Sequence, residues 1–110
     1  MSMLITHLSV YTYEEYLERF AEWVRTNSTS STNPSPSLTG FTKLNWVRAQ
    51  RIQKTIVLYP ELKKATENLK HHYTWMVLTE AWCGDGAQTL PVIAEIANLN
   101  CEKIQLNILL

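Results

Sequence analysis

The stretch TEAWCGDGAQTLPVIAEIA, residues 79–97, decides the fold of this chain. It follows a short continuous apolar run at 75–78, which is typical of a strand buried on both faces, as in a parallel sheet. Apolar residues at helical spacing predict a helix over 86–99, interrupted by Pro91. From Lys103 onward apolar and polar residues alternate, which predicts a second strand. Strand, helix and strand together fit the usual length of a right-handed βαβ crossover.

The segment before this unit is expected to be mainly helical. A first helix is predicted over 12–26, because Thr12 and Glu15 have the spacing of a capping box. Two further helices are predicted, one over 42–57 and one from Pro60 to Leu69. The side chains expected to face inward from these two helices are Leu44, Val47, Ile52, Ile56, Leu62, Ala65 and Leu69.

Residues 26–41 are rich in Ser, Thr, Asn and Pro, and this composition predicts a flexible loop. The expected organisation is a helical region over 1–72, which contains this loop, followed by a βαβ unit over 73–110. The predicted fold class is therefore α/β, a partial βαβ unit preceded by a mainly helical region.

The composition of the chain argues against several classes of function, among them nucleic-acid binding and membrane spanning. The chain has 110 residues, 45% hydrophobic and 18% charged, with a formal net charge of zero, and the missing basic excess disfavours nucleic-acid binding. No stretch approaches the roughly 18 apolar residues of a membrane span, and the first ten residues do not resemble a secretory signal. Two cysteines are too few for a disulfide-stapled secreted module, so we expect a cytoplasmic protein.

The segment AWCGDGAQTLPVIAEIA resembles the strand-to-helix segment that carries the active site of thioredoxins. The matching residues are Trp82, Cys83, Gly84, Pro91 and the run Glu95-Ile96-Ala97. The following KIQLNIL resembles the next strand of that fold, so the likeness covers residues 74–110. The chain is similar to a bacterial thioredoxin-like family with a helical N-terminal extension and a Cys-Gly-Asp-X loop. The resemblance implies a thioredoxin fold with redox chemistry at the cysteine.

Three positions depart from ordinary thioredoxins. Gly86 stands where they carry the second cysteine, Asp85 replaces their usual proline, and Val77 replaces a buried acidic residue. The second half of the family's fold, with its cis-proline loop, is not in this sequence, so either the chain is a piece of a longer protein or another chain completes the sheet. The last strand is therefore expected to be an exposed edge through which the chain forms a homo-oligomer, such as a dimer.

Cys83 is the expected nucleophile, because the start of a helix stabilises a thiolate. Asp85 opposes this effect as a second anion, although Asp also suits the capping position of a helix. The remaining residues of the predicted site are Trp82, Gly84 and Gly86 in the loop and Pro91 at a helix kink. Cys101 lies about 20 Å along the helix, too far to form a disulfide with Cys83. Turnover would need an external small thiol such as glutathione.

Two functions follow from these patterns. The first is monothiol exchange, an oxidoreductase-like activity of Cys83 on a small thiol or a protein disulfide. The alternative is a non-catalytic interaction domain that keeps the thioredoxin fold for binding. We expect no cofactor and no metal, because the adjacent His71 and His72 would point to opposite faces of a strand.

Overall fold

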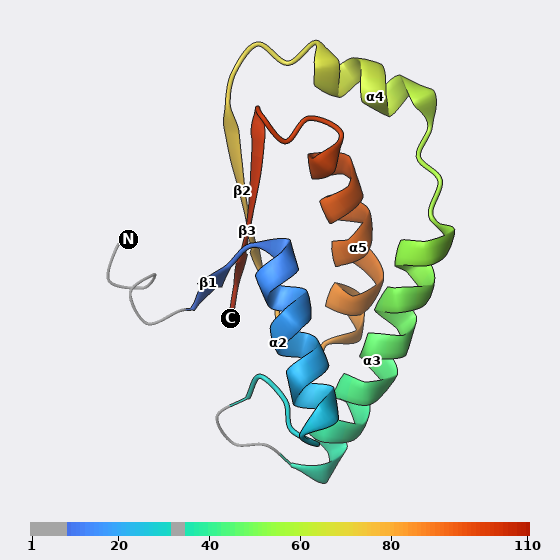
Figure 1. The fold of residues 1–110 in the computed structure, drawn as a ribbon, viewed down its shortest axis with the longest axis vertical. Helices are drawn as coiled ribbons and strands as arrows, with labels where there is room; N and C mark the ends of the chain where they lie inside the picture. Colours follow the sequence, from blue (N-terminus) through green and yellow to red (C-terminus); the bar gives the residue numbers. More distant parts are fainter. Residues whose placement is uncertain (1–8, 32–34) are drawn as a thin grey trace.

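The computed structural model describes residues 9–31 and 35–110, and these form four helices and a three-stranded sheet (Figure 1). The elements are β1 (Val10–Tyr11), α2 (Tyr13–Arg25), α3 (Pro36–Thr55), α4 (Pro60–Glu67), β2 (Tyr73–Leu78), α5 (Gly84–Asn98) and β3 (Ile104–Leu109). The predicted α/β class, with helices first and a βαβ unit after them, is confirmed.

The sheet contains the predicted parallel pair. β2 and β3 run parallel in a register from Tyr73 opposite Ile104 to Leu78 opposite Leu109, and α5 connects them. The strand order is β1-β3-β2, with β1 antiparallel to β3. β3 is therefore the central strand, and the prediction of an exposed C-terminal edge was wrong. Residues 9–11 pair with the second edge of β3, and Ser9 and Leu110 exchange backbone hydrogen bonds in both directions. β3 therefore has no free edge here through which it could pair with a second chain, as the predicted homo-oligomer requires.

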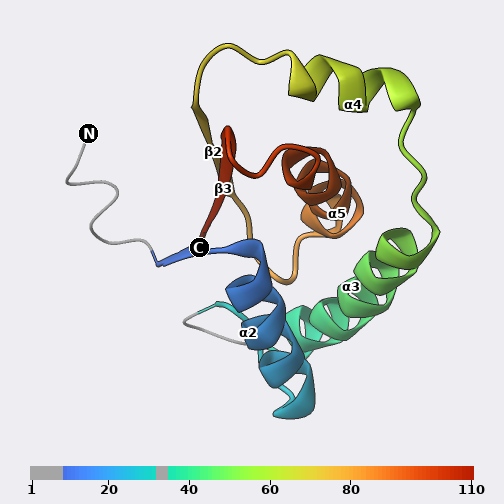
Figure 2. The ribbon, with the colours of Figure 1, turned by 45° about the horizontal axis from the view of Figure 1, so that its top comes forward.

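Within residues 9–31 and 35–110, β2 is covered on one face and not on both, which corrects the prediction from its apolar run. Trp75 and Val77 are half-buried, whereas the side chains of Met76 and Leu78 are 53% and 71% exposed. α5 and α2 lie on the same side of the sheet (Figure 2). Among the described residues no helix covers the opposite face of β2, and a continuous apolar run cannot reveal this because its periodicity is the same in either case.

α2 shows both of the end signals that its sequence carries. The Glu15 N–H donates to Thr12 Oγ1 at 3.1 Å, and the Thr12 N–H donates to Glu15 Oε1 at 2.9 Å, so the predicted capping box is present. At the other end Asn27 adopts a left-handed φ of 61°, which asparagine tolerates, and the Ser28 N–H reaches the Trp23 carbonyl at 2.8 Å. These bonds stop the helix at Arg25.

α3 begins earlier than predicted. It starts at Pro36, with the Ser35 hydroxyl accepting from the Leu38 N–H at 3.3 Å, and it ends at Thr55. Proline suits the first helical position because no N–H is needed there. The expected flexible loop over 26–41 is therefore partly helical. Its Thr29 is buried with its hydroxyl 2.6 Å from that of Thr42, while residues 32–34 lie outside the described residues.

The buried faces of α3 and α4 also differ from the prediction. α3 buries Thr42, Asn45 and Ala49, while the expected Leu44 and Val47 are exposed. In α4 the expected Ala65 is exposed and Thr66 is buried instead. The polar side chains can be buried because each is hydrogen-bonded, as in the bonds from Thr42 Oγ1 to the Leu38 carbonyl and from Thr66 Oγ1 to the Lys63 carbonyl.

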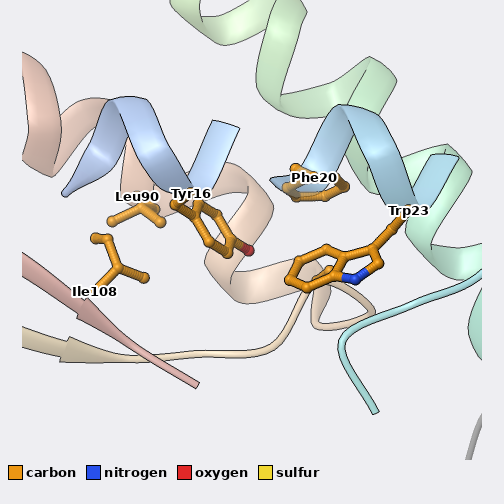
Figure 3. Close-up of a cluster of buried hydrophobic side chains, with 6 residues drawn as sticks. Tyr16, Phe20, Trp23, Leu90 and Ile108 are labelled. Atoms are coloured by element: carbon orange, nitrogen blue, oxygen red, sulfur yellow. The ribbon is translucent and has the colours of Figure 1, made fainter. Parts of the chain in front are cut away.

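One hydrophobic cluster joins the N-terminal helix to the βαβ unit (Figure 3). Its buried members are Tyr16, Phe20 and Trp23 from α2, Leu90 from α5, Ile108 from β3, and Ala81 from the turn after β2. The rings of Tyr16 and Phe20 meet edge to face with centroids 5.5 Å apart. Because Ala81 belongs to this cluster, the packing of α2 also fixes the turn that leads into α5.

Candidate functional site

Cys83 is the N-cap residue of α5, at the carboxyl end of β2. Its N–H donates to the Glu80 carbonyl at 3.0 Å, and its own carbonyl accepts from the Ala87 N–H at 3.2 Å. The side chain is half-buried and makes no capping bond. The sulfur thus stands where the first N–H groups of a helix are free and the helix dipole is positive, an arrangement that favours an anion.

The other predicted site residues differ in where they lie relative to Cys83. Trp82 is 37% exposed, and Asp85 is an exposed residue of the first helical turn. Asp85 therefore does not cap the helix, since Cys83 holds that position. α5 starts at Gly84, before the predicted 86, and runs without interruption through the buried Pro91 to Asn98. Pro91 lies within the helix, away from the loop that contains Cys83.

Two side chains from outside the βαβ unit hold the turn before Cys83. Asn45 of α3 is 1% exposed, and its Nδ2 donates to the Ala81 carbonyl at 3.1 Å. The Ala81 N–H donates to Ser30 Oγ at 2.9 Å, and the Ser30 hydroxyl donates to the Glu80 carboxylate. Both backbone groups of Ala81 are satisfied in this way, which fixes the residue two positions before the thiol.

Arg48 brings positive charge to the same loop. Its Nη1 donates to Asn45 Oδ1 at 3.3 Å and lies 3.3 Å from the position that a Cβ on Gly84 would take. Arg48 and Asp85 thus flank the loop with opposite charges, and they have opposite effects on an anion there. Neither Arg48 nor Asn45 is among the residues that the sequence predicts for the site. The signal that could have found them is Asn45, a polar residue at the centre of a helix with an apolar pattern.

Tyr16 connects the core to the site. Burial is the main cause that raises its pKa above the ordinary value for a phenol, and the charges of Glu80, Tyr13 and Cys83 act in the same direction. In Figure 3 the Tyr16 ring lies among the core side chains of α2, with Leu90 and Ile108 beside it.

A family profile described as Thioredoxin matches residues 31–110. The chain belongs to this thioredoxin family. The match takes in α3 and α4 as well as the βαβ unit, so it is wider than the likeness over 74–110 seen in the sequence. No curated protein and no solved structure matches the chain.

The second cysteine of this thioredoxin-family chain is far from the first along the fold. Cys101 is exposed in the turn after α5, so the 15-residue helix lies between the two thiols. Such a helix rises about 22 Å. Cys101 instead borders a cleft of about 360 Å³ between α2, α5 and β3, which Cys83 does not line. Tyr13 lines the same cleft, and burial, together with Glu95 and Glu14, raises its pKa to about 12.

The described residues contain neither a cluster of metal-ligating side chains nor a membrane-spanning helix. Within 9–31 and 35–110, no three His, Cys, Asp or Glu side chains gather as they would around a metal ion. His71 and His72 are exposed just before β2. No helix in these ranges has the length and apolar content that crossing a membrane requires.

Replacing Asn45 with alanine is expected to destabilise the protein by about 1–3 kcal/mol, because the buried Ala81 carbonyl and the Arg48 guanidinium each lose a partner. Asn98→Ala in α5 is the matched control, since Asn98 is exposed. Urea unfolding followed by circular dichroism measures both variants. Equal midpoints for Asn45→Ala and Asn98→Ala would show that the Asn45 contact does not stabilise the fold.

Proposed function

We propose that this thioredoxin-family chain carries out thiol–disulfide exchange with Cys83 as its single active thiol. The observation that supports the proposal is the place of Cys83 at the N-cap of α5, half-accessible, with Gly86 in the following turn and Cys101 beyond the other end of the helix. A nucleophilic sulfur is therefore available at a helix start, and Cys101 is too far away to form a disulfide with it.

The proposed exchange has two balanced steps. The Cys83 thiolate attacks one sulfur of a disulfide, the substrate S–S bond breaks, and the other half leaves as a thiolate. A small-thiol thiolate then attacks the mixed disulfide and restores the Cys83 thiolate. The small thiol leaves joined to the bound half of the substrate as a mixed disulfide. A second small thiol then attacks this mixed disulfide and frees that half as a thiolate, so two external thiols supply the electron pair and end as one disulfide. A reducing cytoplasm, the compartment that the cysteine content predicts, would supply such a thiol in the form of glutathione.

The test uses Cys101→Ser protein incubated with oxidised glutathione and analysed by intact mass spectrometry. We expect one glutathione adduct, located on Cys83 by peptide mapping and removed by reduced glutathione. Cys83→Ser is the matched control and should carry no adduct in the Cys101→Ser background. Absence of the Cys83 adduct in folded Cys101→Ser protein, under conditions that modify a free cysteine peptide, would refute the proposed exchange.

A binding domain without catalysis is the second candidate, and the exposed Met76 and Leu78 on β2 favour it. Apolar side chains of this kind often mark contact surfaces. The two candidates differ in their need for the thiol. If Cys83→Ser retains the full biological role of the chain while Met76→Ser with Leu78→Ser loses it, binding is the function and exchange is not.

A further inference from the structure

Gly86 faces the end of β2 at very short range. It is the third residue of α5, and a Cβ built on it would overlap Oγ1 of Thr79, whereas Cβ of Thr79 would lie 3.5 Å away, an ordinary contact. The glycine does not have a positive φ, so its backbone conformation is open to any residue. The requirement for glycine at position 86 therefore comes from the Thr79 side chain.

Thr79 is poorly able to withdraw from this contact. The residue is 8% exposed, and its N–H donates to the Leu109 carbonyl at 3.0 Å, which anchors its backbone to the central strand. The Cβ of a threonine carries Oγ1, Cγ2 and one hydrogen. Only one of its three staggered rotamers would therefore point the small hydrogen, and not a heavy atom, toward residue 86. Any side chain at position 86 would thus compete with Thr79 for the same space.

We propose that Thr79 is the residue that restricts this site to a single thiol. Its side chain fills the space beneath the helix start that a second cysteine at position 86 would need. The site is therefore closed to two-thiol chemistry by packing at residue 79, as well as by the glycine at 86. This inference concerns the active thiol assigned under the proposed function and rests on it for the chemical consequence, while the steric part stands independently.

The steric part is tested by a double-mutant cycle of Gly86→Ala and Thr79→Ala, measured by denaturant unfolding. In the presence of Thr79, Gly86→Ala should lower the folding equilibrium constant about ten-fold, as overpacking of a core does. With Thr79→Ala already made, Gly86→Ala should cost nothing or stabilise, because alanine is the better helix former. Gly40→Ala is the matched control, since no side chain or backbone from outside its own turns of α3 lies within 4 Å of its Cβ position. That change should stabilise α3 in either background.

The chemical part is tested with Gly86→Cys in Cys101→Ser protein, alone and together with Thr79→Ala, exposed to oxidised glutathione. In the combined variant the introduced thiolate should attack Cys83 in its mixed disulfide, expelling glutathione as a thiolate and closing an intramolecular disulfide. Two protein thiols thereby reduce one glutathione disulfide to two thiols. Mass spectrometry would register the loss of two hydrogens and no retained glutathione, and insulin reduction with dithiothreitol should rise above that of the parent protein.

The outcomes separate the two ideas. Rescue of the Gly86 variants by Thr79→Ala, including rescue from failure to fold, supports the role of Thr79. Additive effects of the two alanine substitutions would overturn it. A combined variant that folds and forms a glutathione adduct on Cys83, yet never closes the disulfide, would also overturn it. Failure of Cys83 to form any adduct in the parent protein, with the rescue intact, would count against the exchange and leave the steric role supported.

Discussion

Phe20→Ala is expected to lower the free energy of unfolding by about 3–5 kcal/mol, the usual cost of truncating a buried aromatic ring. Phe20 is 2% exposed, and its ring lies 5.5 Å from that of Tyr16 and 5.2 Å from that of Trp46 between centroids. Those partners come from α2 and α3, so the variant would leave a cavity between two helices that both contact the rest of the fold. A domain of this size has only about 5–15 kcal/mol of stability in total.

The matched control for this change is Phe41→Ala in α3, whose side chain is 52% exposed. Its effect should stay within about 0.5 kcal/mol. Guanidinium unfolding followed by tryptophan fluorescence and circular dichroism measures both variants. If Phe20→Ala does not fold, Phe20→Leu supplies a smaller loss that is still measurable. Indistinguishable unfolding curves for Phe20→Leu, Phe41→Ala and the parent protein would refute the assigned core.

Folding stability is expected to fall steeply above about pH 10, where a phenol of ordinary pKa ionises. Burial raises the pKa of Tyr16, and to about 12 that of Tyr13, so the folded protein keeps protons that the unfolded chain releases. Stability is therefore fully present below pH 10 and is lost as the pH rises toward the folded-state pKa values. Ionisation of Tyr16 alone can lower the free energy of unfolding by up to about 1.4 kcal/mol per pH unit. Tyr13 is less buried, and solvent screening makes its contribution to this loss smaller.

Tyr16→Phe isolates this effect because it keeps the ring contacts and removes the ionisable group. Urea unfolding at pH 8, 10 and 11, with reductant present, should give a parent curve that falls more steeply than that of Tyr16→Phe. Tyr59→Phe is the control, since Tyr59 is 77% exposed and this change removes a phenol that lies outside the core. Parallel stability curves for the parent protein and Tyr16→Phe would show that the phenol titrates freely in the folded state.

The local elements could be predicted from the sequence because their signals lie within a few residues. The capping box of Thr12 and Glu15 is present as the pattern indicated, and the strand begins at Ile104, one residue after the predicted start. The helix that follows Cys83 is also present, although it begins two residues earlier than predicted and continues through Pro91. Even the parallel pairing of β2 and β3 follows from a local rule, since a strand, a helix and a strand in succession close a right-handed crossover. The start of α3 was also readable from Ser35 and Pro36, and it was missed because the surrounding Ser and Thr suggested a loop.

The strand-helix-strand unit and the position of Cys83 at the start of its helix could thus be predicted from the residues alone, because hydrophobic periodicity and end signals act locally. The central place of β3, the hydrogen bonds from Ser30 and Asn45 to Ala81, and the contact of Thr79 with Gly86 become visible only in the folded structure. The bonds to Ala81 join residues 51 and 36 positions apart, and the overlap at Gly86 depends on where the end of β2 meets α5. Such contacts depend on how whole helices and strands pack against one another, and no periodic pattern in the sequence indicates them.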